Sequence, residues 1–147
     1  MKFLLDTNTC IRYINGRSSQ IRARMRTMDE QDIVVSTITM GEMFAGSAKS
    51  RQPQHSRSKQ DAFFIRFKHL SFDSVAADEF GRIRAYLDTA GTQIGPYDMQ
   101  IAAIAVVHNL IVVTHNTREF GRISWLKVED WELYYDVLCE GCDAALK

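Results

Sequence analysis

Short apolar runs alternate with helical segments along the chain, and this alternation restricts the fold more than any other feature of the sequence. Continuous apolar runs of this length are typical of strands that are buried on both faces. The clearest runs lie at residues 2–6, 33–35 and 110–114. Strands that are separated by helices usually form a parallel sheet with helices on both faces. The sequence therefore predicts an α/β fold with a short central parallel sheet flanked by helices.

The segments between these strands have helical spacing. We expect long helices at residues 37–48, 60–70, 74–90 and 95–109, and shorter ones that begin near Thr9 and at residue 21. Residues 50–58 are polar and basic and contain Pro53, so we expect a loop there. Two weaker strands are expected at residues 71–73 and 125–128. An aromatic face at Phe63, Phe64 and Phe67 is expected to belong to the core or to a subunit interface.

The 147-residue chain is long enough to form one domain whose core needs neither disulfides nor metal. Its apolar runs are far too short to span a membrane and no signal peptide is expected, so we expect a cytoplasmic protein without a membrane partner. The three cysteines are an odd number, which argues against a disulfide framework. Cys139 and Cys142 form a single C-x-x-C motif without a second Cys/His pair, and the sequence leaves any redox or metal role for them open.

Acidic side chains, or the amide of one, occur where the expected strands end or the following helices begin. Asp6 ends the first strand, Glu42 lies one turn inside the helix after the second, Asp98 lies in the first turn of a later helix, and Asn116 follows the last clear strand. Ligands of such sheets bind beyond the carboxyl ends of the strands, so these residues can meet there. Neighbouring carboxylates resist ionising together, and a divalent cation removes the conflict. Oxygen ligands favour a hard ion, Mg²⁺ or Mn²⁺.

Each acid alone has a simpler explanation. Asp6 could cap the following helix with its side chain, Glu42 could be an exposed helical acid, and Asp98 could complement a helix N-terminus. Only the combination of the three indicates a metal site.

These residues lie in four motifs that resemble those of PIN-domain nucleases, in particular the VapC toxins of bacterial VapBC toxin–antitoxin pairs. The motifs are LLDTNTCI at 4–11, STITMGEMFAGSAKS at 36–50, GTQIGPYDMQIAAIA at 91–105 and VVTHNTREFGRI at 112–123. Their order and spacing match over nearly the whole chain. The resemblance implies a PIN-like fold over residues 1–131 and leaves residues 132–147 as a C-terminal extension without an assigned role.

The resemblance also implies an activity. VapC toxins are Mg²⁺- or Mn²⁺-dependent endoribonucleases that cleave structured RNA, with transfer RNA as our first choice of target, and so inhibit translation. Asp6, Glu42 and Asp98 are implied as metal ligands and catalytic acids. Asn116 is implied as the fourth catalytic position; it stands where many PIN proteins have Asp, so the number of metal ions stays open. We do not assign His115 as a general acid, because the family works through metal-activated water.

Four further residues are implied to support the site rather than to bind the metal. Thr7 and Asn8 follow the first acid and could fix the loop at the strand end. Thr114 ends the central strand and could hydrogen-bond the Asp6 carboxylate. Glu119 could add a more distant acid.

The charge is balanced overall, with 18 basic and 18 acidic residues, so no global attraction to nucleic acid is expected. Basic residues are nevertheless concentrated in the first 60 positions. The candidates for phosphate contacts lie just after the Glu42 helix and are Lys49, Arg51, Arg57 and Lys59. A solvated helix surface would explain the same charges.

The resemblance implies a homodimer that binds a VapB-type antitoxin, which gathers toxin dimers into larger assemblies and reaches the acidic site. The alternative within the same fold is a catalytically inactive PIN domain that acts as a binding module. Cleavage of DNA by the same site is a further alternative, since the metal chemistry does not depend on the sugar. A receiver-like signalling domain is disfavoured because the chain lacks the adjacent acids and the lysine that such a site requires.

Overall fold

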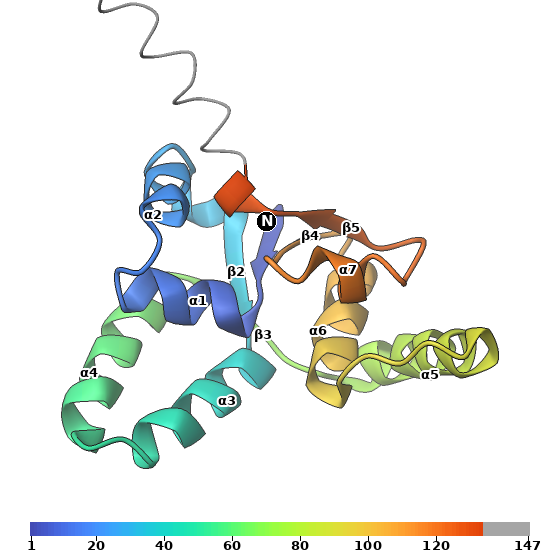
Figure 1. Ribbon diagram of the computed structural model, residues 1–147, viewed down its shortest axis with the longest axis horizontal. Helices are drawn as coiled ribbons and strands as arrows, with labels where there is room; N and C mark the ends of the chain where they lie inside the picture. Colours follow the sequence, from blue (N-terminus) through green and yellow to red (C-terminus); the bar gives the residue numbers. More distant parts are fainter. Residues whose placement is uncertain (134–147) are drawn as a thin grey trace, which may run out of the picture.

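A parallel sheet of five strands forms the centre of the molecule, in the order β3-β2-β1-β4-β5 (Figure 1). The computed structural model describes residues 1–133, so the Cys139/Cys142 motif and all but the first two residues of the C-terminal extension lie outside the described residues. The strands are β1 (Phe3–Leu5), β2 (Ile33–Ser36), β3 (Lys68–Leu70), β4 (Ile111–Val113) and β5 (Lys127–Glu129). This confirms the predicted fold class.

Seven α-helices and one short 3₁₀ helix connect these strands within residues 1–133. They are α1 (Thr7–Ile14), α2 (Ser19–Arg26), η1 (Glu30–Asp32), α3 (Thr37–Ala48), α4 (Pro53–Phe64), α5 (Ser74–Ala90), α6 (Pro96–Val107) and α7 (Thr117–Phe120). Helices α1 to α4 gather on one side of the sheet and α5 to α7 on the other (Figure 1). All neighbouring strands of the sheet are parallel, so the carboxyl ends of the five strands lie at one edge.

The central strand β1 explains why the apolar runs have no polar interruption. Leu4 packs into one core cluster, together with α5 and α6, while Phe3 and Leu5 pack into a second cluster with α1, α2 and α4. All three side chains are buried, because successive residues of a strand point to opposite faces and both faces are covered here.

Several expected boundaries are wrong. The helix expected at residues 60–70 spans Pro53–Phe64 instead, and the end of the expected helix is strand β3. The loop expected at residues 50–58 is largely helix, because Pro53 occupies the first turn of α4, where its missing N–H costs nothing. The polar residues that suggested a loop are the exposed face of this helix. The strand expected at 71–73 lies instead at Lys68–Leu70, at the edge of the sheet, where exposed Lys68 and His69 give it no apolar pattern.

The aromatic residues of α4 and the segment after it are buried. Phe63, Phe64 and Phe67 belong to the core cluster on the α1 side of the sheet, which confirms the core as one of the two places expected for them. Within residues 1–133, no helix combines the length and the apolar character that crossing a membrane requires.

Removal of a buried side chain between α5 and the rest of the core tests this packing. Ile83→Ala should lower the free energy of unfolding by about 2–5 kcal/mol, because Ile83 is 0% exposed and the deletion leaves a cavity. The matched control is Ile65→Ala, at a position that is 84% exposed, where we expect a change within about 0.5 kcal/mol. Urea unfolding of both variants measures the difference, and equal destabilisation would contradict the assigned core.

Candidate metal and active site

Asp6 is a buried carboxylate at the carboxyl end of the central strand. Its Oδ1 accepts a hydrogen bond of 2.8 Å from the Thr9 backbone N–H, so it caps α1, as the simpler explanation proposed. This cap also moves the start of α1 to Thr7, two residues before the expected start. The Thr114 hydroxyl forms a second hydrogen bond to this carboxylate. Asp6 is therefore held in one orientation at the edge where the strands end.

Burial dominates the protonation of Asp6. Desolvation raises its pKa above 3.8, the hydrogen bonds from Thr114 and Thr9 oppose this rise, and the Glu42 carboxylate adds to it. Asp6 is only 3% exposed, so little water compensates its charge. A cation at this point would relieve the conflict.

The side chain of Glu42 is held by a hydrogen bond from the first residue of α1. The Thr7 hydroxyl donates a hydrogen bond of 2.7 Å to Glu42 Oε1, and Thr7 Oγ1 also lies 3.1 Å from Thr39 Oγ1. Ser36 caps α3 through the Thr39 N–H. These contacts join the ends of β1 and β2 and position Glu42. Asn8 is exposed in the first turn of α1.

The N-terminus of α6 places Asp98 near Asp6 and Glu42. It lies half-buried in the first turn of α6, and its pKa is raised to about 6, first by desolvation and then by the carboxylates of Asp6, Glu42 and Glu119. Carboxylates from three other segments thus lie close enough to Asp98 to raise its pKa. Among the described residues, no basic side chain contributes to this shift.

Asn116, in the fourth motif, forms hydrogen bonds to Thr114 and to Glu119. Its backbone N–H donates to Thr114 Oγ1 at 2.9 Å, and the Thr114 side chain in turn lowers the pKa of the Asp6 carboxyl. Its side-chain Nδ2 donates to Glu119 Oε2 at 2.9 Å. Glu119 therefore belongs to the cluster, and Asn116 contributes a neutral amide oxygen beside it.

The donor set fits a hard divalent cation. Asp6, Glu42 and Asp98 offer only carboxylate oxygens, which Mg²⁺ and Mn²⁺ prefer. The raised pKa values of Asp6 and Asp98 have the sign expected of acids that lack a counter-charge. The sequence pointed to these three acids, but not to Thr39, which had no visible signal beyond being a threonine in the first turn of a capped helix.

The four basic candidates lie around α4 and all are exposed. Arg57 is already engaged, because its Nε is 2.9 Å from Asp61 Oδ1 and its guanidinium stacks 3.5 Å from the centre of the Phe44 ring. Lys49 caps the C-terminus of α3, and Arg51 lies in the turn before α4.

Lys59 shares a cleft with one of the acids. It lines a cleft of about 250 Å³ between α1, α3 and α4, and Glu42 lines the same cleft. The structure therefore brings one basic candidate and one acid of the cluster to a common opening.

A parallel sheet with carboxylates gathered at its carboxyl edge defines an α/β domain of the kind that holds a divalent cation. The sequence profile of the PIN domain matches residues 3–126. The tRNA(fMet)-specific endonuclease VapC of Salmonella typhimurium is 41% identical over 131 residues, which cover 89% of this chain and 98% of that protein. The VapC protein of the same name from Shigella flexneri is 38% identical over the same shares.

Solved structures give the same result. A DNA-bound VapBC from Salmonella typhimurium matches with a TM-score of 0.85 and 41% identity over 89% of this chain and 98% of that one. VapBC2 from Rickettsia felis, bound to a promoter fragment, matches with a TM-score of 0.83 and 31% identity over 89% of this chain and 99% of that one. The chain belongs to the PIN-domain family and, within it, to the VapC proteins.

The raised pKa of Asp98 predicts a pH-dependent gain in stability for Asp98→Asn. Between 3.8, its ordinary value, and about 6, the folded state binds more protons than the unfolded state, so native stability falls as pH rises through this window. In metal-free buffer at pH 7.5, Asp98→Asn should stabilise the protein by on the order of 1 kcal/mol, less than the full shift implies because solvent screens a half-exposed carboxyl.

Urea unfolding at pH 7.5 and at pH 3.5 measures this effect. The gain should be largely lost at the lower pH, where the Asp98 carboxyl is mostly protonated in both states. An Asn variant that is equally or less stable than the wild type at pH 7.5 would contradict the clustering of these acids.

Proposed function

We propose that the chain is the toxin of a type II toxin–antitoxin pair, a Mg²⁺- or Mn²⁺-dependent endoribonuclease that cleaves transfer RNA. The observation that carries this proposal is the convergence of Asp6, Glu42, Asp98 and Glu119 at one sheet edge. The choice of substrate follows the 41% identical relative, whose name specifies tRNA(fMet). We therefore name initiator transfer RNA as the first substrate to test.

The three acids Asp6, Glu42 and Asp98 would hold the ion. When bound, a divalent ion polarises the phosphoryl group and lowers the pKa of an attacking water. The chain itself supplies orientation: Thr9 and Thr114 fix the Asp6 carboxylate, and Thr7 fixes Glu42. Such outer hydrogen bonds hold metal ligands in place before the ion arrives.

Asn116 and Glu119 complete the edge of the site. Because Asn116 Nδ2 donates to Glu119, its carbonyl oxygen remains as a neutral acceptor for a water or an ion. The pair adds one negative charge where two aspartates would add two. This favours one tightly held ion over two.

The cleft beside Glu42 offers a path for the RNA backbone. Lys59 lines this cleft and can contact a phosphate there. Lys49, Arg51 and Arg57 lie on the neighbouring surface of α3 and α4 and can contact flanking phosphates. Such contacts position the RNA without reading its sequence, so they do not by themselves select a transfer RNA.

The partner we propose is a VapB-type antitoxin. The matched structures from Salmonella typhimurium and Rickettsia felis are VapBC complexes on DNA. A cluster of carboxylates attracts a basic side chain by the same field that attracts a cation, so an antitoxin segment with an Arg or Lys suits this site. We further propose a toxin homodimer and a larger assembly with the antitoxin.

Removal of a single carboxylate should abolish cleavage. With Mg²⁺, the wild type should cut initiator transfer RNA, whereas Asp6→Asn and Asp98→Asn should each be slower by at least about a hundredfold, because several kcal/mol of charge stabilisation are lost. The matched control is Asp88→Asn on α5, where the aspartate forms only an exposed ion pair with Arg84. Single-turnover assays on purified RNA measure the rates.

Three further samples separate the alternatives. A chelator should stop cleavage and added Mg²⁺ or Mn²⁺ should restore it, while an elongator transfer RNA and a single-stranded DNA should be poor substrates. If the wild type binds RNA but cuts no faster than Asp98→Asn, the chain is a binding module and the enzymatic proposal fails.

A further inference from the structure

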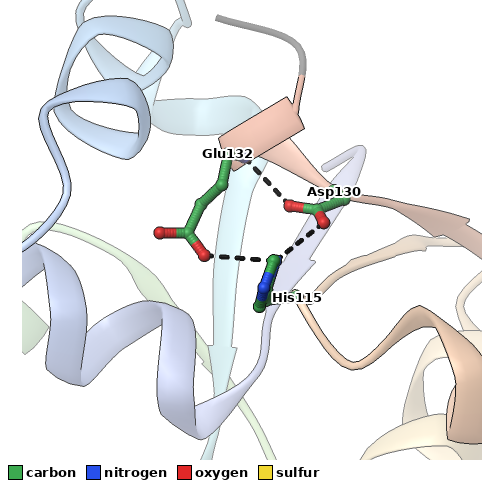
Figure 2. A group of neighbouring side chains, drawn as sticks. All are labelled: His115, Asp130 and Glu132. Atoms are coloured by element: carbon green, nitrogen blue, oxygen red, sulfur yellow. Dashed lines mark hydrogen bonds and ion pairs between the residues drawn. The ribbon is translucent and has the colours of Figure 1, made fainter. Parts of the chain in front are cut away.

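A second group of metal-binding side chains lies where the two strands at one end of the sheet finish. His115 follows β4, and Asp130 and Glu132 follow β5, so the parallel pairing of these strands brings the three together (Figure 2). The His115 side chain is 64% exposed, whereas those of Asp130 and Glu132 are only 6% and 12% exposed. Two largely buried carboxylates thus face one accessible imidazole.

The ligand atoms of the three residues lie within 4.8 Å of one another, and two of their spacings are close to those around a small metal ion. His115 Nδ1 lies 2.9 Å from Asp130 Oδ2 and 3.3 Å from Glu132 Oε2. Tetrahedral coordination with bonds of about 2.0–2.1 Å places ligand atoms about 3.3–3.4 Å apart. Side-chain movements of a few tenths of an ångström would therefore admit an ion between these atoms.

The remaining oxygen of each carboxylate is already bonded elsewhere. Asp130 Oδ1 accepts the Glu132 backbone N–H at 3.0 Å, and Glu132 Oε1 accepts the Arg12 guanidinium at 2.7 Å. Trp131, between the two acids, is 1% exposed and anchors the backbone in the core. Bonds of this kind orient metal-ligating carboxylates in proteins. The free oxygens Asp130 Oδ2 and Glu132 Oε2 are the ones that face His115, as Figure 2 shows.

The charge of the group is incomplete without a cation. Among the ion pairs seen in residues 1–133, Glu132 pairs with Arg12, and Asp130 pairs with His115, which is charged only when it is protonated. Asp130 and Glu132 are not among the carboxylates that raise the pKa of Asp98, which are Asp6, Glu42 and Glu119.

We propose that His115, Asp130 and Glu132 form a second metal site that takes a first-row transition ion such as Zn²⁺, with water in the fourth position. One imidazole nitrogen with two carboxylate oxygens suits this class of ion better than Mg²⁺, which prefers oxygen ligands alone. The site does not depend on the proposed nuclease function. A bound ion would join the loop before α7, which carries Asn116, to the segment after β5 and, through Arg12, to α1.

Zinc titration of the full chain tests the site. The titration is done in metal-free buffer in competition with a chromophoric chelator. The wild type should bind one equivalent of Zn²⁺ through His115. His115→Ala should bind this equivalent at least about tenfold more weakly, because one ligand is lost. Asp130→Asn should weaken binding similarly. The matched control is His55→Ala, which removes an exposed histidine of α4 and should leave zinc affinity unchanged.

Two backgrounds exclude the other possible zinc ligands. Asp98→Asn and the double variant Cys139→Ser/Cys142→Ser should both retain the zinc equivalent that depends on His115. Zn²⁺ should also raise the Tm of the wild type and not that of His115→Ala, since a ligand stabilises only the state that binds it. The proposal is overturned if the wild type binds no zinc, or if His115→Ala, shown by circular dichroism to be folded, binds it as tightly as the wild type.

Discussion

The mutual repulsion of carboxylates that are held out of water at one sheet edge is the constraint on which the rest of the site depends. Asp6 is buried at the end of the central strand, and Asp98 and Glu42 approach it from two helices on different sides of the sheet. Burial and like charge both raise the pKa of Asp6 and Asp98, which is unfavourable for stability at neutral pH. A fold that keeps such a conflict gains from a cation bound at that point.

The parallel sheet makes this arrangement possible. Its strands end at one edge and both faces are covered by helices. Asp6 and Asn116 lie between a strand and the next helix at that edge, and Glu42 lies on α3, which follows β2. Hydrogen bonds from threonine hydroxyls then fix the acids, as Thr7 does for Glu42 and Thr114 for Asp6. The energy that holds the site comes from the apolar core, while its geometry comes from these few polar contacts.

Much of this could be predicted from the sequence, because the informative signals are local. The apolar strand around Leu4 and the acid directly after it can be read from adjacent residues. The helix that begins at Pro53 could not, because an exposed polar helix and a polar loop have the same composition. The pairing of His115 with Asp130 depends on the register of β4 against β5, a contact between distant positions that no local pattern encodes.

Anomalous diffraction from crystals of the wild type grown with Mn²⁺ tests the central claim most directly. We predict a manganese peak within coordination distance of the carboxylate oxygens of both Asp6 and Asp98, on the side that Glu42 faces. Crystals in which the ion lies away from these carboxylates, or in which Asp6 and Asp98 stay free of metal while Mn²⁺ is bound elsewhere on the molecule, would contradict the account.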